Sequence, residues 1–171
     1  MECTLQGKAH STFYLKRVRS GQEMVEVRIL TSRDIALFDK VADEVFDNPI
    51  NPELASAFLA DPRHHIAVGI DDGVVVGFAS GVDYIHPDKP AELWINEVGV
   101  APTHLGRGIG KRIVACLLEH GVSIGCRTAW VVTEAGNAPA RALYVSAGGK
   151  LDVELEDPDG QPVLYLFSQD A

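Results

Sequence analysis

The spacing of apolar positions divides most of the chain into short strands and helices. Val74–Val82 and Ala91–Val100 are apolar runs of strand length, whereas Ile109–His120 carries apolar residues at helical spacing. The segment Asp71-Asp72-Gly73 between two apolar runs is typical of a β-hairpin turn. The pattern predicts strands at Val25–Leu30, His65–Ile70, Val74–Val82, Ala91–Val100, Ala129–Thr133, Leu151–Glu156 and Pro162–Phe167, and helices at Ser32–Val45, Pro52–Ala60, Ile109–His120 and Pro139–Ala147.

The patterned part of the chain is long enough for one domain. Residues 1–23 are polar and weakly patterned, so we expect them to be an extension outside the core. Residues 24–171 are predicted to form a single domain, because a chain of 171 residues suits one hydrophobic core.

A glycine-rich turn joins the strand Ala91–Val100 to the helix that begins near Ile109. Glycines at 106, 108 and 110 let backbone N–H groups come close to an anion, and the helix N-terminus adds partial positive charge. The turn is therefore a candidate phosphate-binding loop. A glycine-rich turn without a ligand is the alternative.

Two common phosphate-binding motifs do not fit this turn. A Walker A loop requires glycine at 105 and a hydroxyl at 112, where the chain has Leu105 and Arg112. A dinucleotide fingerprint requires its third glycine at 111, whereas the chain has Gly110. Gly108 and Gly110 match the pattern [Q/R]-x-x-G-x-[G/A], from which Leu105 departs. This turn resembles the acetyl-CoA loop of the GCN5-related N-acetyltransferases (GNAT).

A second segment, Asn137–Gly149, strengthens the resemblance. It is similar to the GNAT pattern N-x-x-A-x-x-[L/F]-Y-x-x-x-G-F, with matches at Asn137, Tyr144 and Gly148 and a departure at Gly149. The resemblance covers roughly residues 25–168 and has both motifs in the family order. It implies an α/β (α+β) fold with a mixed, mostly antiparallel sheet, splayed fourth and fifth strands, and about four flanking helices.

The resemblance also implies an activity and its residues. We expect an N-acetyltransferase that uses acetyl-CoA as co-substrate and transfers the acetyl group directly in a ternary complex. Glu97 would act as general base and Tyr144 would protonate the departing thiolate. The residues expected to bind acetyl-CoA are Val98, Gly99, Val100, Leu105, Gly106, Arg107, Gly108, Ile109, Gly110, Lys111, Asn137, Ala138, Arg141 and Tyr144.

Strand periodicity gives an expectation for the environment of Glu97. A period of two places Glu97 on the face of Leu93 and Ile95. A carboxyl group among apolar neighbours should have a raised pKa, as a general base requires. A core-edge carboxylate paired with Arg or Lys is the structural alternative.

The segment Leu93–Val100 and its surroundings resemble the aminoglycoside 3-N-acetyltransferases within this superfamily. That subgroup has an aromatic fourth strand ending in an acidic residue, a position that Glu97 takes, although Asn96 replaces the aromatic residue expected before it. The resemblance implies acetylation of an aminoglycoside at the 3-amino group. The residues expected to bind this substrate are Asp47, Asp83, Glu97, Glu154 and Asp157.

The charge balance is compatible with a cationic small-molecule amine as substrate. Asp and Glu number 24 and Lys and Arg 15, which gives a net charge of −9. An acidic surface attracts cations and disfavours nucleic acids, which need a basic face. Simple solvated acidity is the alternative for any single carboxylate.

Several features predict a cytoplasmic protein without a metal. No apolar run approaches the ~20 residues of a membrane span, and the N-terminus has no apolar stretch typical of a signal peptide. Three cysteines at 3, 116 and 126 lack metal-site spacing, and the six histidines form no HExxH motif. We therefore expect reduced thiols, no metal and no membrane partner.

Two other interpretations remain open. The acceptor amine could belong to a protein N-terminus, a lysine or a small metabolite. A non-catalytic module that senses acyl-CoA is the alternative of another class, although the presence of both Glu97 and Tyr144 favours an enzyme. The sequence is compatible with a homodimer as well as with a monomer.

Overall fold

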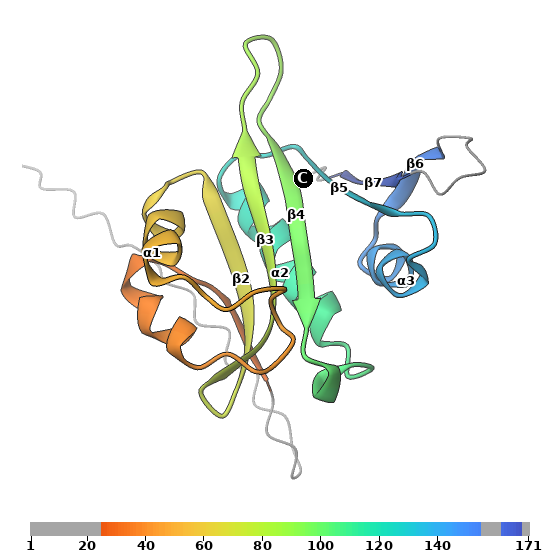
Figure 1. The fold of residues 1–171 in the computed structure, drawn as a ribbon. Coiled ribbons are helices and arrows are strands. Elements are labelled where there is room, and N and C mark those ends of the chain that lie inside the picture. The colour runs from red at the N-terminus through yellow and green to blue at the C-terminus, as the bar shows by residue number, and fades with distance from the viewer. Residues whose placement is uncertain (1–24, 155–161, 169–171) are drawn as a thin grey trace, which may run out of the picture.

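The computed structural model describes residues 25–154 and 162–168, which form one seven-stranded sheet with helices on both faces (Figure 1). The strand order is β1-β2-β3-β4-β5-β7-β6. β4 and β5 are parallel and all other neighbours are antiparallel, so the sheet is mixed and mostly antiparallel, as predicted. The strands are β1 (Glu26–Ile29), β2 (His64–Asp71), β3 (Val74–Tyr84), β4 (Glu92–Val100), β5 (Thr128–Glu134), β6 (Lys150–Glu154) and β7 (Pro162–Ser168). The helices are η1 (Ser32–Asp39), α1 (Pro52–Ala60), η2 (Pro102–His104), α2 (Ile109–Ser123) and α3 (Ala138–Ser146).

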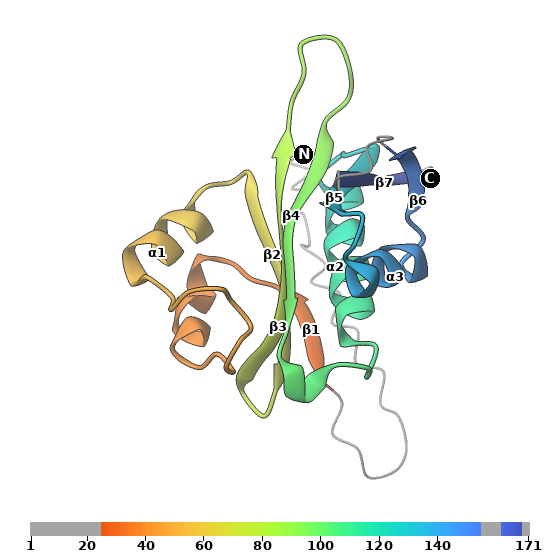
Figure 2. The same cartoon turned by 45° about the vertical axis from the view of Figure 1, so that its right-hand side comes forward.

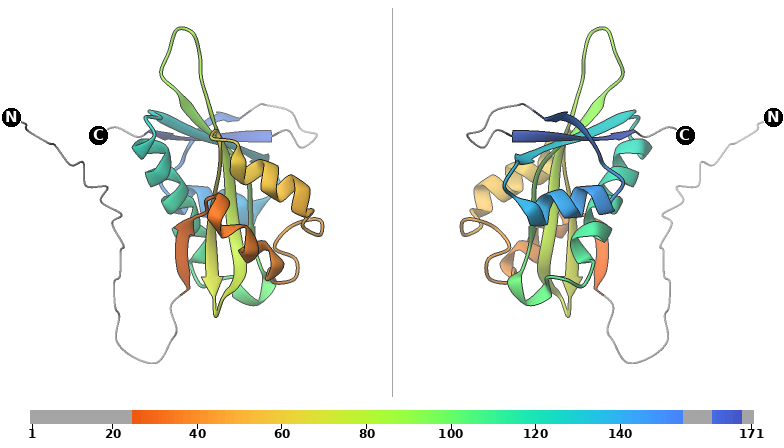
Figure 3. Two further views of the ribbon diagram at one scale, coloured as in Figure 1. Left: turned by 90° about the vertical axis from the view of Figure 1, so that its left-hand side faces the viewer. Right: turned by 90° about the vertical axis from the view of Figure 1, so that its right-hand side faces the viewer.

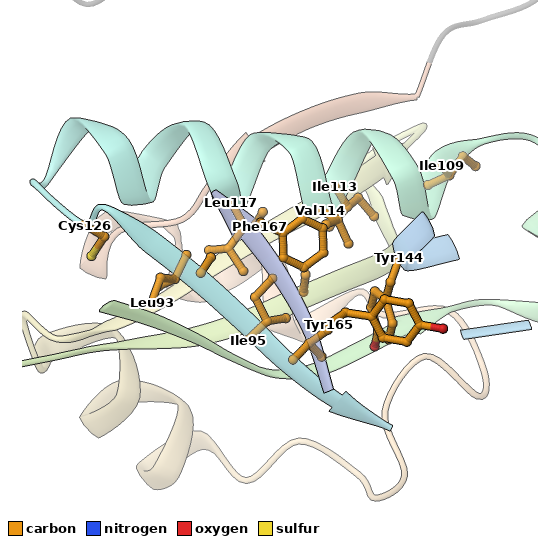
Figure 4. Close-up of a cluster of buried hydrophobic side chains, with 14 of the residues drawn as sticks. Leu93, Ile95, Ile109, Ile113, Val114, Leu117, Cys126, Tyr144, Tyr165 and Phe167 are labelled. Carbon is orange, nitrogen blue, oxygen red and sulfur yellow. The ribbon is translucent and has the colours of Figure 1, made fainter. Parts of the chain in front are cut away.

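The helices divide between the two faces of the sheet (Figure 2). α2 and α3 cover one face, called here the α2 face, and α1 and η1 lie on the opposite face, called the α1 face. α2 buries a stripe of apolar side chains against the sheet, because residues three and four apart share one side of a helix. Figure 4 shows this stripe packed on side chains of β4 and β7. Its large apolar members are Ile109, Ile113, Val114 and Leu117.

The hairpin turn between β2 and β3 has the predicted form. Asp72 and Gly73 both have positive φ angles, 48° and 75°, and Asp71 pairs with Val74 across the turn. Two residues with positive φ between paired strands match the twist of an antiparallel ribbon. Local sequence therefore sets the register of this hairpin.

The first predicted helix is shorter and of a different type. Residues Ser32–Asp39 form a 3₁₀ helix, capped by the Thr31 side chain rather than by Ser32. The helix does not continue to Val45, because the backbone beyond it bonds to Val75 at the start of β3. Val75 N–H donates to the Lys40 carbonyl at 2.8 Å, and Ala42 N–H donates to the Val75 carbonyl at 2.9 Å.

β4 contains a β-bulge, and this irregularity positions the site. Ser80 pairs with Glu97 and Gly81 pairs with Ile95, so Asn96 has no partner on β3. Cross-strand partners share a face, and Gly81 lies under Leu117 of α2. Ile95 therefore faces α2, whereas Glu97 points to the α1 face.

Directly after the bulge, β4 and β5 separate. Their pairing ends at Ile95 with Val131, and Figure 1 shows β5 diverging from β4 toward α3. Figure 3 shows β5 and β7 turned across the direction of β3. The predicted splaying of the fourth and fifth strands is confirmed.

Two of the three cysteines and all the helices that the structure describes can be compared with the predictions. Cys126 is buried and Cys116 half-buried, and both are free thiols. Among the helices within residues 25–154 and 162–168, none is both long and apolar enough to cross a membrane. The predicted extension, residues 1–23, and Cys3 lie outside the described residues.

Candidate active site

The glycine turn before α2 forms an anion cradle. Gly106 and Gly108 have φ angles of 73° and 71°, and Gly108 is the residue directly before the first turn of α2. A Cβ atom on either glycine would meet no atom within 4 Å, so the turn borders open space. Free N–H groups at a helix N-terminus and a left-handed turn favour a phosphate group.

This turn borders a cleft of about 620 Å³ on the α2 face, between the C-terminal half of β4 and α3. The size is that of a site for a cofactor or small ligand. The cleft combines an apolar strand wall, backbone N–H groups and one lysine. Its lining residues are Val98, Val100, His104, Leu105, Gly106, Gly108, Ile109, Gly110, Lys111, Asn137, Pro139, Ala140, Ala142, Leu143, Tyr144 and Ser146.

Most residues predicted to bind acetyl-CoA line this cleft, but four do not. Gly99, Arg107, Ala138 and Arg141 are absent from its wall. Arg141 instead donates from Nε to the Tyr165 hydroxyl at 3.1 Å and from Nη1 to the Ala135 carbonyl at 2.9 Å. Its guanidinium therefore holds α3 against the β5–β7 part of the sheet.

Arg107 and His104 both contact the carboxylate of Asp71, a residue that does not line the cleft. Arg107 Nη1 lies 3.6 Å and His104 Nε2 3.0 Å from Asp71 Oδ2 in the β2–β3 turn. Asp71 thereby ties the glycine turn to the hairpin. His104 was not among the predicted site residues, and the only signal for it in the sequence is its position directly before the glycine motif.

The remaining lining residues that sequence analysis missed lie on α3. All of them lie within the Asn137–Gly149 motif, but helical spacing from Tyr144 could have indicated only Ala140, which is four residues away. They are Pro139, Ala140, Ala142, Leu143 and Ser146.

Tyr144 reaches the cleft from the middle of the core. The residue is 5% exposed and its ring lies 5.8 Å from the Tyr165 ring (Figure 4). Burial raises the pKa of the Tyr144 phenol above its ordinary value. The hydroxyl is therefore protonated at neutral pH and is available as a proton donor.

Glu97 lies on the other face of the sheet, and the predicted placement beside Leu93 and Ile95 is wrong. The bulge at Asn96 reverses the alternation, so Glu97 shares the α1 face with its partner Ser80. The predicted direction of its pKa is confirmed. Burial, and then the negative charge of Asp47, raise the pKa of the Glu97 carboxyl.

A loop anchored on β3 and β4 places Asp47 near Glu97. Val45 is buried, and the Phe46 ring stacks on Phe78 with centroids 4.0 Å apart. Gly99 lies opposite Phe78, and a Cβ atom there would collide with the Val45 carbonyl oxygen. Glycine at 99 therefore lets the loop lie on the strand, which explains its absence from the cleft wall.

Asp83 does not join these two carboxylates. It pairs with Leu93 and so faces α2, where its Oδ1 lies 2.9 Å from Nε2 of the buried His65. His65 Nδ1 in turn lies 2.9 Å from His120 Nε2 on α2. The structure places Asp83 in this partly buried chain of polar side chains, away from the face of Glu97.

The last two predicted substrate residues are not placed at the site. Glu154 ends β6, but its side chain lies outside the described part of the structure, as does Asp157 altogether. No group of His, Cys, Asp and Glu within the described residues could hold a metal ion.

The two faces of the sheet carry chemically different groups where β4 and β5 separate. The α2 side offers a phosphate cradle and the Tyr144 phenol, and the α1 side offers the Glu97 and Asp47 carboxylates. A donor bound in the cleft and a cation held by the carboxylates would meet at the opening of the two strands. Such an arrangement suits group transfer between two substrates.

Comparison with known proteins agrees with this geometry. Residues 33–148 match the acetyltransferase (GNAT) family. The chain belongs to this family. The acetyl donor is acetyl-CoA, the family's co-substrate and a ligand in solved structures of this fold.

Three similar proteins show the range of acceptors within the family. The N-alpha-acetyltransferase RimI of Mycobacterium tuberculosis is 30% identical over 128 residues, which are 74% of this chain and 78% of RimI. The L-2,4-diaminobutyric acid acetyltransferase of Virgibacillus pantothenticus is 33% identical over 84 residues, 49% of this chain and 52% of that enzyme. An aminoglycoside acetyltransferase from a soil metagenome, solved with sisomicin, has a TM-score of 0.65 at 14% identity and covers 78% of this chain and 93% of its own.

Proposed function

We propose that this GNAT enzyme acetylates a primary amine of a small molecule that carries several ammonium groups. An aminoglycoside antibiotic, acetylated at its 3-amino group, is the leading candidate. The observation that carries the proposal is the pair of carboxylates, Glu97 and Asp47, on the sheet face opposite the acetyl-CoA cleft. Glu97 is partly buried and Asp47 is exposed, and two neighbouring carboxylates attract a polycation more strongly than a neutral amine. The net charge of −9 supports this preference.

The residues of the cleft would hold the donor. Gly106, Gly108, Gly110 and Lys111 line the cleft, and their backbone N–H groups and the Lys111 ammonium would bind the pyrophosphate. Val98 and Val100 line the strand wall beside it. A backbone N–H group of β4 in this stretch would bond the thioester oxygen and stabilise the negative charge that develops there.

Glu97 and Tyr144 would move the protons. Glu97 accepts a proton from the acceptor ammonium, and the freed nitrogen lone pair attacks the thioester carbon. The carbon–sulfur bond then breaks as the Tyr144 hydroxyl donates its proton to the departing thiolate. The second proton of the attacking nitrogen is then lost and restores the Tyr144 phenol, while Glu97 returns its proton to solvent. The products are the amide and free CoA, with one proton released to solvent. The raised pKa of the Glu97 carboxyl supports its role as a base, and the Tyr144 phenol is protonated at neutral pH, as a proton donor must be.

Replacing Tyr144 with Phe is expected to lower kcat by about 10- to 100-fold, toward the lower end of general-acid contributions. The acetyl-CoA dissociation constant should change less than about threefold, because the ring keeps its packing against Tyr165. Steady-state kinetics and calorimetry measure the two effects. Full activity of the Phe variant would show that water protonates the sulfur.

An acceptor panel tests the substrate class. Purified enzyme should consume acetyl-CoA rapidly with sisomicin or gentamicin, and more slowly with L-2,4-diaminobutyrate or with peptides that have a free N-terminus. Added salt should raise KM for the aminoglycoside more than it lowers kcat, because screening weakens the long-range attraction of the carboxylates. Turnover of peptides with no detectable turnover of any aminoglycoside would refute this acceptor.

A protein N-terminus is the second candidate acceptor. The likeness to RimI, an N-alpha-acetyltransferase, spans 74% of this chain and favours it. The panel separates the two, since a peptide N-terminus carries a single reactive ammonium group. Acetyl-CoA binding without turnover of any acceptor would instead support a sensor role.

A further inference from the structure

The two tryptophans of the chain lie side by side in neighbouring strands. Trp94 of β4 is directly opposite Trp130 of β5, with ring centroids 5.7 Å apart and planes inclined by 16°. The rings are therefore stacked across the last paired stretch before the two strands separate. We refer to Trp94 and Trp130 as the indole platform.

The indole platform lies on the face that carries Glu97. Leu93 and Ile95, the neighbours of Trp94 in β4, are fully buried on the α2 face, so Trp94 points the other way. Trp94 pairs with Val82 and Glu97 pairs with Ser80, two residues earlier on β3. Alternate residues of β3 share a face, which makes the indole platform and the Glu97 carboxylate neighbours on the α1 face.

The indole platform is not part of the hydrophobic core. Neither tryptophan belongs to the two core clusters of the described chain, and Trp94 is 39% exposed. Figure 1 shows α1 and η1 beside β2, away from β4 and β5. Trp130 stacks on the Trp94 ring, and Trp94 still keeps an exposed surface that a ligand can contact.

We propose that the indole platform determines acceptor specificity by binding a second ammonium group of the acceptor through a cation–π contact. The reacting amine of the same molecule lies at Glu97, so the platform selects diamines and larger polyamines over monoamines. This inference rests on the proposed function. An indole has the most favourable ring face for a cation, and the nearby carboxylates of Glu97 and Asp47 increase the local negative potential.

Substitutions of Trp94 separate a cation–π contact from simple apolar packing. Trp94→Phe keeps an aromatic face, whereas Trp94→Leu keeps apolar area without one. With sisomicin as acceptor, Trp94→Leu should raise KM by about 5- to 30-fold, and Trp94→Phe by distinctly less. For both variants kcat should stay within about twofold and KM for acetyl-CoA should not change, because the donor binds on the other face.

Val122 provides a matched control. It is an exposed apolar residue of α2, 48% exposed, on the opposite face of the sheet. Val122→Ala should leave all constants at wild-type values. A wild-type KM for sisomicin in Trp94→Leu would overturn the role of the platform, while leaving the proposed acceptor class intact.

A non-reacting probe tests the platform independently of acetylation. Choline is a cation, and 3,3-dimethylbutanol is its neutral analogue of similar shape. Since both tryptophans of the chain are in the platform, intrinsic fluorescence reports on it directly. Choline should change the emission saturably and 3,3-dimethylbutanol should not, and the choline response of Trp130 should weaken in Trp94→Leu. Equal responses to both probes would overturn the cation–π contact. A choline response without acetylation of sisomicin would support the platform and reject the proposed acceptor.

Discussion

A Gly108→Asp variant is expected to lose acetyl-CoA binding while it keeps its fold. The glycine sits at the N-terminus of α2 with a φ angle of 71°, and its missing Cβ leaves space open to the cleft. An aspartate there would place a negative charge where the pyrophosphate binds. Unfavourable like-charge contacts at a binding site cost several kcal/mol, so the dissociation constant should rise by at least about 100-fold.

A second glycine controls for backbone strain. A residue other than glycine in the left-handed region costs about 1–2 kcal/mol, which should lower the thermal stability of Gly108→Asp. Gly125 follows the far end of α2, has a φ angle of 96° and is not part of the cleft wall. Gly125→Asp should show a similar loss of stability with unchanged acetyl-CoA affinity by calorimetry. Unchanged affinity in a folded Gly108→Asp protein would reject the cradle.

Replacing Glu97 with Gln is expected to lower kcat by about 10²- to 10⁴-fold at neutral pH, the range for a lost general base. The glutamine has nearly the same shape but cannot accept the ammonium proton. The loss should shrink as pH rises, because an increasing share of the acceptor amine is already neutral. Glu53→Gln in α1, an exposed site outside the cleft wall, should retain wild-type rates.

The pH dependence of kcat/KM tests the same assignment. The active form of Glu97 is the carboxylate, so activity should fall as pH decreases through its raised pKa. Burial is the main cause of this shift and the charge of Asp47 the second. Asp47→Asn removes only the second cause, so the acid limb should move to lower pH without reaching the ordinary range of glutamate. A loss in Glu97→Gln that is the same at all pH values would indicate a positioning role instead.

Local sequence was sufficient for most of the architecture. The Asp71–Gly73 turn, the helical stripe of α2 and the glycine turn before it depend on residues adjacent in the chain, and all were predicted correctly. Most residues that line the cleft likewise belong to the glycine turn before α2 and to the Asn137–Gly149 motif, and the others lie on or near β4. Turn geometry and helical periodicity are properties of short segments, so they can be recognised without tertiary information.

The orientation of the general-base candidate could not be predicted in this way. Strict alternation along β4 places Glu97 with Leu93 and Ile95, but pairing with β3 leaves Asn96 without a partner and reverses the face. A bulge depends on how two strands fit together, and neither strand's sequence specifies it alone. The same bulge puts the carboxylate on the side opposite the acetyl-CoA cleft.

The sequence by itself determined the GNAT fold, the glycine turn before α2, and the presence of an acidic residue on β4 and a tyrosine on α3. Only the tertiary structure decided which polar side chains are available. Asp83 lies at hydrogen-bond distance from His65 and Arg141 donates to Tyr165, partners 18 and 24 residues away in the chain. Trp94 and Trp130, far apart in sequence, become stacked neighbours. Polar groups that folding removes from water bond to the partners that lie within hydrogen-bond distance. These partners are distant in the chain, so periodicity and motif spacing do not predict them.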